Sequence, residues 1–301
     1  MKELIVIDSI SSAHEIMSLP KPTHPLISVV SYGDMQNSQI DNDTRIRIDL
    51  FQIWVKSGAN CKIGYGRNTY DFEEGTLAFM KPGQVISHQE EIDSDAEGFM
   101  VAFHPDLIRK SALSRIIDQY TFFNYEVHEA LHISEGEKQI LYDIIKKIKS
   151  EIGQNIDKHS QALIISNLEL FLGYCTRYYD RQFYTRTNLN QDFITRFEDV
   201  LKTYYTLNKQ VELSLPSVLY CAKEMNMSAS YLGDLLRKET GKSPQEHIHD
   251  FVIGKAKNKL LGSTVSLGEI AYSLGFEYSQ HFSKVFKKKT GQTPSAYRQL
   301  N

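Results

Sequence analysis

The last third of the chain contains an internal repeat. Residues 240–244 read Thr-Gly-Lys-Ser-Pro and residues 290–294 read Thr-Gly-Gln-Thr-Pro, an offset of 50 positions. Three positions upstream match at the same offset: Leu232 with Phe282, Leu236 with Phe286, and Lys238 with Lys288. Further upstream the offset is 49, because Ala222 matches Ala271. The repeat predicts two copies of one supersecondary unit in this region.

Each copy has the pattern of a short apolar helix, a tight turn and a second helix. In the first copy, residues 217–241, the small Ala222 precedes the turn, and Ser228 is the expected N-cap of the second helix. In the second copy, residues 266–291, Gly275 supplies the backbone freedom that a sharp turn needs. This is the layout of a helix-turn-helix, whose second helix enters the major groove of DNA. A non-DNA adaptor made of packed helical hairpins is the alternative.

The formal charge is unevenly distributed along the chain. The whole chain carries a net charge of -3, which by itself discourages a nucleic-acid partner. Residues 190–301 hold 15 Lys and Arg against 11 Asp and Glu, a net of +4, so the remainder carries -7. The cationic part coincides with the repeat, which favours DNA binding there.

The second copy resembles the C-terminal signature of the AraC/XylS family of transcriptional regulators. The resemblance rests on the Gly275-Phe276 turn, on the Phe282 and Phe286 core positions, and on the ending Gly291-Gln292-Thr293-Pro294-Ser295-Ala296-Tyr297-Arg298. It implies a sequence-specific DNA-binding regulator whose two helix-turn-helix units read two successive major grooves. A connecting helix over residues 245–261 would span roughly 26 Å at about 1.5 Å per residue, and successive grooves lie about 34 Å apart.

The first part of the chain is predicted to be rich in β-structure. Residues 26–32, 45–55, 60–65 and 77–80 are rich in Ile, Val, Phe and Tyr, and turns containing Gly separate them. Many short strands of this kind are typical of a sandwich or small barrel. Four segments also resemble the cupin-like sensor region of the same family: residues 64–67, 74–77, 82–84 and 103–107. A barrel ahead of a DNA-binding region predicts a sensor for a small-molecule effector.

The apolar period becomes helical after residue 135, and two amphipathic helices separated near residues 153–157 are expected. The predicted fold class is therefore α+β with two domains, a cupin-like β-barrel with a helical pair and an all-α tandem helix-turn-helix. The predicted organisation is a sensor barrel over 1–135, a dimerising helical pair over 136–180, a linker over 181–192 and a DNA-binding domain over 193–301.

Helical facing selects the side chains that are expected to contact DNA. The expected base-reading residues are Ser230, Asp234, Ser279, Gln280, Ser283 and Lys284. The expected phosphate contacts are Arg237, Lys238, Lys287, Lys288 and Arg298, although the helix dipole also favours lysines at a helix end. Family members often carry longer polar or basic side chains where this chain has Gly233 and Asp234, and Val252 replaces the arginine of the linking helix. We therefore expect the second unit to contribute more to base reading than the first.

The N-terminal region supplies candidate effector-binding and dimerisation residues. Candidate effector-binding residues are Trp54, Tyr65, Arg67 and His88. The apolar stripe of the first long helix is the candidate dimer surface, made by Ile140, Ile144, Ile145 and Ile148. The alternative is that this stripe only covers its own barrel. The expected partners are double-stranded DNA, a small-molecule effector, a second copy of the chain and, for an activator, RNA polymerase.

A cupin-type metal enzyme is the remaining alternative. Such a site normally needs a close His-x-His pair with a carboxylate and another His, whereas His88 stands alone in the sequence. We therefore predict no catalytic residue, no metal, no cofactor and no enzymatic activity. No apolar run reaches about 18 residues, and the three cysteines lie far apart without a C-x-x-C pair. These features predict a cytoplasmic protein without a membrane segment.

Overall fold

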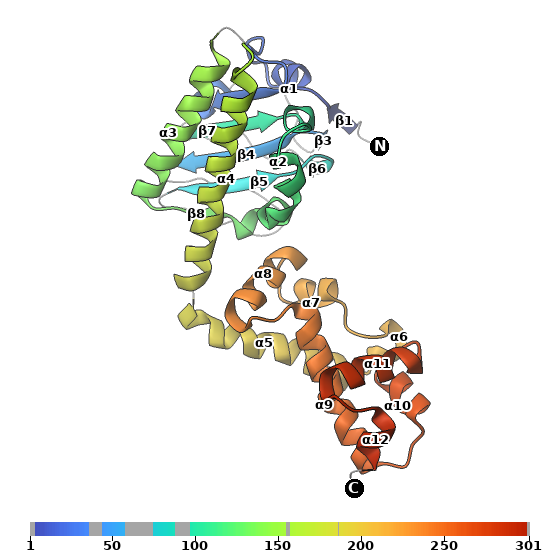
Figure 1. The fold of residues 1–301 in the computed structure, drawn as a ribbon. Coiled ribbons are helices and arrows are strands. Elements are labelled where there is room, and N and C mark those ends of the chain that lie inside the picture. Colours follow the sequence, from blue (N-terminus) through green and yellow to red (C-terminus); the bar gives the residue numbers. More distant parts are fainter. Residues whose placement is uncertain are drawn as a thin grey trace. The chain divides into compact units, whose positions relative to one another are not determined.

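The computed structural model describes residues 4–35, 44–57, 75–87, 97–154, 157–185 and 187–299. The chain divides into two compact units, the N-terminal unit Met1–Tyr184 and the C-terminal unit Thr185–Asn301 (Figure 1). The N-terminal unit combines two sheets with helices, and the described part of the C-terminal unit is helical. The predicted α+β fold class with two domains is confirmed.

Two sheets form the framework of the N-terminal unit. The smaller sheet has the order β1-β3-β6, in which β1 (Leu4–Ile7) runs parallel to β3 (Arg45–Ile48) and β6 (Gln84–Ser87) runs antiparallel to it. The larger sheet has the order β2-β7-β4-β5-β8, and each of its pairs is antiparallel. Its strands are β2 (Ile27–Ser31), β7 (Glu97–Phe103), β4 (Phe51–Ser57), β5 (Thr76–Met80) and β8 (Leu131–His132). Short helical segments complete the unit: α1 (Ile10–Ile16), α2 (Leu113–Ile116) and the 3-10 turns η1 (Tyr32–Met35), η2 (Pro105–Leu107), η3 (Ile117–Gln119), η4 (Thr121–Asn124) and η5 (Val127–Glu129).

The segment predicted as one strand, residues 45–55, is two strands in different sheets. In β3 the expected alternation holds, because Ile46 and Ile48 are buried while Arg45 and Arg47 are exposed. The chain breaks after Ile48 and continues as β4, whose residues are nearly all buried. A strand covered on both faces loses the alternation, which explains why the sequence did not show the break. The strand predicted over 60–65 lies outside the described residues.

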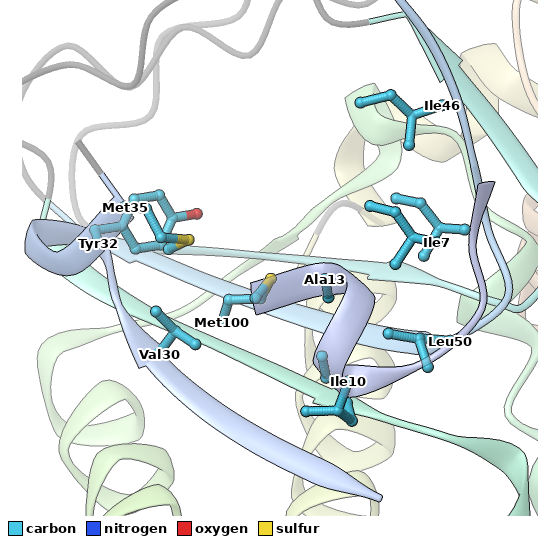
Figure 2. Packing of buried hydrophobic residues seen from close by; sticks show 11 residues of the cluster. Ile7, Ile10, Ala13, Val30, Tyr32, Met35, Ile46, Leu50 and Met100 are labelled. Atoms are coloured by element: carbon cyan, nitrogen blue, oxygen red, sulfur yellow. The ribbon is translucent and has the colours of Figure 1, made fainter. Parts of the chain in front are cut away.

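A hydrophobic cluster joins the two sheets (Figure 2). It combines Ile7 of β1 and Ile46 of β3 with Val30 of β2 and Met100 of β7, and α1 adds Ile10. Helix α1 begins with a capping box, in which the hydroxyl of Ser9 accepts from the backbone N–H of Ser12. The face of the larger sheet that packs against this cluster is the inner face of the unit.

Helices α3 (Glu135–Ile152) and α4 (Ser160–Thr185) lie across the other face of the larger sheet (Figure 1). Tyr142 of α3 packs edge-on against Phe99 of β7, with ring centroids 5.1 Å apart. Arg181 of α4 donates two hydrogen bonds of 2.9 Å to the carboxylate of Glu137 in α3. The predicted helical pair is present, with its break where the sequence placed it, and it belongs to the same compact unit as the sheets.

The C-terminal unit contains eight described helices, and the residues predicted as a linker are helical on both sides of residue 186. The helices are α5 (Thr187–Thr206), α6 (Gln210–Leu213), α7 (Val218–Glu224), α8 (Ala229–Thr240), α9 (Pro244–Gly262), α10 (Leu267–Ser273), α11 (Ser279–Thr290) and α12 (Pro294–Arg298). Helix α9 is the connecting helix predicted over 245–261.

The sequence repeat is also a structural repeat. The Thr240 hydroxyl donates to the Leu236 carbonyl at the end of α8, and the Thr290 hydroxyl donates to the Phe286 carbonyl at the end of α11. Each helix then ends at a left-handed glycine, Gly241 or Gly291. Because glycine adopts positive φ without steric cost, both copies reverse direction at the same point.

Candidate nucleic-acid interface

The first helix-turn-helix consists of α7, a turn at residues 225–227 and α8. The backbone N–H groups of Met225 and Met227 both donate to the carbonyl of Ala222, at 3.1 and 2.9 Å. Ala222 is fully buried, as the close approach of two helices requires. The hydroxyl of Ser228 accepts from the N–H of Tyr231, so the predicted N-cap of α8 is confirmed.

The second helix-turn-helix consists of α10, a turn at residues 274–276 and α11. The N–H of Phe276 donates to the carbonyl of Ala271 at 3.0 Å, the same contact as in the first unit. Gly275 has a φ of +92°, and a Cβ added there would lie 2.7 Å from the carbonyl oxygen of Ser214. The turn therefore requires glycine for its backbone conformation and also for its close contact with the segment after α6.

Helix α11 presents several exposed polar side chains. Gln280, Lys284, Lys287 and Lys288 are exposed, and within the described ranges none of these lysines forms an ion pair. Ser279 and Ser283 are half-buried, and the Ser283 hydroxyl donates to the Ser279 carbonyl at 3.0 Å. An amide and three cations are thus available on α11 for a polar, anionic partner.

Helix α8 offers fewer exposed polar side chains to a partner than α11 does. Its apolar stripe, made by Tyr231, Leu232, Leu235 and Leu236, lies in the core. Asp234 is only 21% exposed and lies 3.6 Å from the guanidinium of Arg237, so part of the Arg237 charge is neutralised within the helix. Gly233 is buried, although a Cβ added there would meet nothing within 4 Å.

The remaining predicted positions on this surface differ in exposure. Ser230 is half-buried, and Lys238 is exposed at the end of α8. Arg298 is half-buried, and its guanidinium donates to the Val265 carbonyl at 2.6 Å. This contact ties α12 to the loop before α10, so the structure gives Arg298 a role in fixing that loop.

Helix α9 holds the two repeats together through Asp250, which the sequence analysis did not select. One carboxylate oxygen of Asp250 lies 2.9 Å from Nζ of Lys242, after α8, and the other lies 2.7 Å from Nζ of Lys289, in α11. Burial alone would raise the pKa of Asp250, but the hydrogen bonds from the two lysines outweigh it and the pKa is lowered. The sequence pattern around Asp250 gives no sign of this contact, because both of its lysine partners lie outside α9.

The candidate effector-binding residues are only partly described. Trp54 is half-buried on β4, its indole N–H donates to Oε1 of Gln52 at 3.1 Å, and its ring lies edge-on to Tyr32. Tyr65, Arg67 and His88 lie outside the described residues. In the described ranges, no group of three or more His, Cys, Asp or Glu side chains is arranged to hold a metal ion.

The candidate dimerisation stripe is mostly internal. Ile144, Ile145 and Ile148 are buried within the N-terminal unit, and Ile140 alone of the four is exposed. The three buried side chains cover their own sheet, which was the alternative interpretation. A dimer contact through the helical pair α3 and α4 would therefore have to use other residues, such as the exposed Leu163 and Leu170 of α4.

No described helix is both long and apolar enough to pass through a bilayer.

Two matched helix-turn-helix units in one helical body, with exposed cations on the second, define a DNA-binding regulator. A model described as a helix-turn-helix domain matches residues 221–300, and one described as an AraC-like ligand binding domain matches residues 47–172. The chain belongs to the AraC family of transcriptional regulators, with a ligand-binding domain ahead of its DNA-binding domain.

Its similarity to known proteins extends over both units. It is 25% identical over 240 residues to the uncharacterized HTH-type transcriptional regulator YfiF of Bacillus subtilis, covering 78% of this chain and 72% of YfiF. It is 29% identical over 160 residues to the HTH-type transcriptional activator RhaR of Escherichia coli, covering 50% of this chain and 53% of RhaR. Among solved structures, the C-terminal domain of the response regulator yesN from Fusobacterium nucleatum has 25% identity and a TM-score of 0.32, covering 36% of this chain and 98% of that one. These relatives are transcriptional regulators, and the metal-enzyme and adaptor alternatives are not favoured.

Proposed function

We propose that this regulator reads two successive major grooves of one DNA site with α8 and α11 and responds to a small-molecule effector in its N-terminal unit. The observation that best supports this proposal is the pair of ion pairs that Asp250 of α9 makes with Lys242 and Lys289. We call it the Asp250 bridge, and it connects α9 to both repeats. With 19 residues, α9 is about 28 Å long at about 1.5 Å per residue. A spacer of that length suits recognition helices separated by about one turn of DNA, roughly 34 Å.

Helix α11 is the main reader in this proposal. Gln280 and Lys284 lie one helical turn apart and are exposed, so both can reach base edges in the same groove. An amide can pair with adenine and a lysine with guanine, whereas Lys287 and Lys288 near the helix end suit phosphates. Helix α8 adds Ser230 and the Arg237 and Lys238 cations, while Asp234 accepts from cytosine or repels phosphate.

The proposed assembly is a homodimer. One chain presents only a small excess of positive charge in residues 190–301, a net of +4. Two linked DNA-binding units would raise occupancy through effective concentration without any new base contact. Sedimentation of the full chain at tens of micromolar would contradict this part if the chain stayed monomeric.

The remaining parts of the proposal concern the setting in which the regulator acts. We place the regulator in the cytoplasm and expect no enzymatic activity of its own. If it activates transcription, we expect it to contact RNA polymerase. Transcription in a purified system, with and without the regulator, separates activation from repression.

The decisive test is binding to DNA from upstream of the chain's own gene at moderate salt, with Lys284→Ala as the variant. The variant should lose about 1 to 3 kcal/mol of binding free energy at the specific site and relax the preference at one base position. Lys202→Ala is the control, because Lys202 is exposed on α5 and pairs only with Asp199 among the described residues. An unchanged footprint and affinity for Lys284→Ala would remove α11 as the reader.

A further inference from the structure

Tyr278 occupies the N-cap position of α11, where a short polar side chain is usual. At the offset of 50 positions it corresponds to Ser228, whose hydroxyl caps α8. Helices α7, α9, α10 and α12 also begin at a serine or threonine whose side chain caps them. Tyr278 makes no capping hydrogen bond, so α11 begins without the stabilisation that its counterpart α8 has.

The side chain of Tyr278 is also not held by the rest of the fold. It is 69% exposed, and within the described residues its hydroxyl has no hydrogen bond and its ring has no aromatic or cationic partner. Its backbone is fixed, because its carbonyl accepts from the N–H groups of His281 and Phe282 at 3.0 and 3.2 Å. A large ring in solvent thus occupies a position where serine would stabilise the helix. A residue that breaks a local rule without a compensating contact in the fold indicates a functional role.

The position of Tyr278 brings its side chain to the end of α11 that reads DNA. The recognition helix of a helix-turn-helix contacts base edges with its N-terminal residues. Gln280 is two residues from Tyr278 and exposed, and Lys284 lies about one turn further along the helix. When α11 lies in a major groove, the ring of Tyr278 is therefore brought next to the base pairs that Gln280 reaches.

The chemistry of a tyrosine ring indicates which base it would recognise. The ring itself carries no hydrogen-bond donor or acceptor, so its contact with a base edge is apolar. The C5-methyl group of thymine is the apolar group that base pairs present in the major groove. The phenolic hydroxyl can stay in contact with water while the ring packs against this methyl group, because tyrosine combines an apolar body with a polar tip.

We propose that Tyr278 is a specificity-determining residue that recognises one thymine by packing its ring against the C5-methyl group. This inference rests on the proposed role of α11 as the main reader and adds one base contact to it. Ser228 occupies the same position in the first unit, so α8 has no ring for an equivalent contact. The two units therefore differ in the base that they recognise at this position.

The probe for this contact is a DNA duplex selected from a random-sequence pool by the full chain. Each thymine of the duplex is replaced in turn by deoxyuridine, which pairs with adenine in the same way but lacks the methyl group. Replacement of the thymine that Tyr278 contacts should weaken binding by the wild type about fourfold. This factor corresponds to about 0.8 kcal/mol for one buried methyl group.

Three variants assign this effect to the ring. Tyr278→Phe keeps the ring and should keep the fourfold loss. Tyr278→Ser removes the ring and should bind the thymine and deoxyuridine duplexes equally at that position. A serine can cap α11, so a melting temperature at or above that of the wild type shows that the variant is folded. Tyr272→Ala is the matched control, because Tyr272 is 61% exposed in α10 and its loss should leave the discrimination intact.

Two results overturn the proposal. The first is the same response to deoxyuridine in the wild type and in Tyr278→Ser at every position of the duplex. The second is weaker binding by Tyr278→Phe without any response to deoxyuridine that depends on the ring, because the hydroxyl would then contact a phosphate.

Lys284→Ala, measured on the same duplexes, separates this inference from the proposed function. If Lys284→Ala relaxes one base position and no deoxyuridine effect depends on Tyr278, α11 remains the reader and the thymine contact fails. If Lys284→Ala and Tyr278→Ser both leave the footprint and the specific affinity unchanged, α11 is not the reader and the proposed function fails as well.

Discussion

The Tyr205 hydroxyl donates a hydrogen bond of 2.9 Å to the carbonyl of Leu274, which joins α5 to the turn of the second helix-turn-helix. The Tyr205 ring also contacts α9, where the centroid of Phe251 lies 5.8 Å away and Nζ of Lys255 lies 5.2 Å away. Burial raises the pKa of Tyr205, so its hydroxyl stays a donor throughout the working range of pH. One side chain thus ties the first helix of the C-terminal unit to the turn that orients α11.

Tyr205→Phe removes this hydrogen bond and leaves the Leu274 carbonyl without its side-chain donor. The free energy of unfolding of the C-terminal unit should fall by about 1 to 2 kcal/mol. Specific DNA binding should weaken more than non-specific binding, because α11 is less firmly held while its cations remain. Urea unfolding and gel shifts at two salt concentrations measure both effects. Tyr272→Phe is the matched control, since Tyr272 is 61% exposed in α10 and should change neither quantity.

Replacing two glycines of the helix-turn-helix units by alanine should change the free energy of unfolding in opposite directions. Gly275→Ala forces a Cβ to within 2.7 Å of the Ser214 carbonyl oxygen at a φ of +92°, so we expect a loss of at least about 2 kcal/mol. Gly233→Ala lies inside α8 with open space around the new Cβ, and should gain about 0.5 to 1 kcal/mol from helix propensity. Thermal unfolding of the two variants beside the wild type tests the pair. Equal behaviour of the two alanines would show that the Ser214 contact does not constrain the turn.

The sequence predicts the repeats better than it predicts how they are held together. The repeat spacing identifies both helix-turn-helix units and Gly275 marks the turn of the second, because those signals depend on residues close together in the chain. The Tyr205–Leu274 hydrogen bond and the Asp250 bridge join residues of different helices, so no local pattern reveals them. For the same reason Ile144 was predicted to lie on a dimer surface. It is buried, because it packs within a unit whose sheet is formed by strands distant in the sequence.

Asp250→Asn tests the bridge between the two repeats. The substitution removes the charge that Lys242 and Lys289 share, and stability should fall by about 1 kcal/mol because the pairs are partly exposed. The two released cations should tighten non-specific DNA binding and steepen its salt dependence, while the ratio of specific to non-specific affinity falls. Asp199→Asn provides the comparison, because its pair with Lys202 is exposed and lies within α5 alone. An unchanged affinity ratio would show that α9 holds the two repeats without this bridge.

Helix α11 lacks the side-chain cap that α8 has. Tyr278 occupies the N-cap position of α11 and makes no capping hydrogen bond, whereas Ser228 caps α8. Tyr278→Ser should stabilise the C-terminal unit by about 1 kcal/mol, because a serine hydroxyl can accept from a free N–H of the first turn. Tyr278→Ala shortens the side chain equally without an acceptor and should give no such gain. A rise in melting temperature confined to the serine variant would confirm the missing cap.

His247 should make the C-terminal unit less stable in mild acid. Its Nε2 lies 2.7 Å from the Thr240 hydroxyl, which itself donates to the Leu236 carbonyl, so His247 is the donor in this contact. Burial lowers the pKa of His247 and the nearby Lys242 lowers it further, against the opposing effect of Asp250, Glu198 and Glu246. The folded state therefore binds this proton less tightly than the unfolded state. The stabilisation is complete above the unfolded value, about 6.5, and declines as the pH falls from there toward the folded value.

The measurement is the unfolding free energy of the full chain at pH 7.5 and 5.5 for the wild type and His247→Gln. The carboxylates with lowered pKa are Asp157, Asp250, Glu246 and Glu269, and because their ordinary pKa values are 3.8 to 4.5, they titrate below this window. His249 and His24 also have pKa values lowered by burial and contribute in the same direction, so the wild type keeps part of its pH dependence in the variant. His247→Gln retains a donor for Thr240 without the titration, and its loss of stability between the two pH values should be smaller than that of the wild type. An identical pH dependence in both proteins would mean that His247 is equally easy to protonate folded and unfolded.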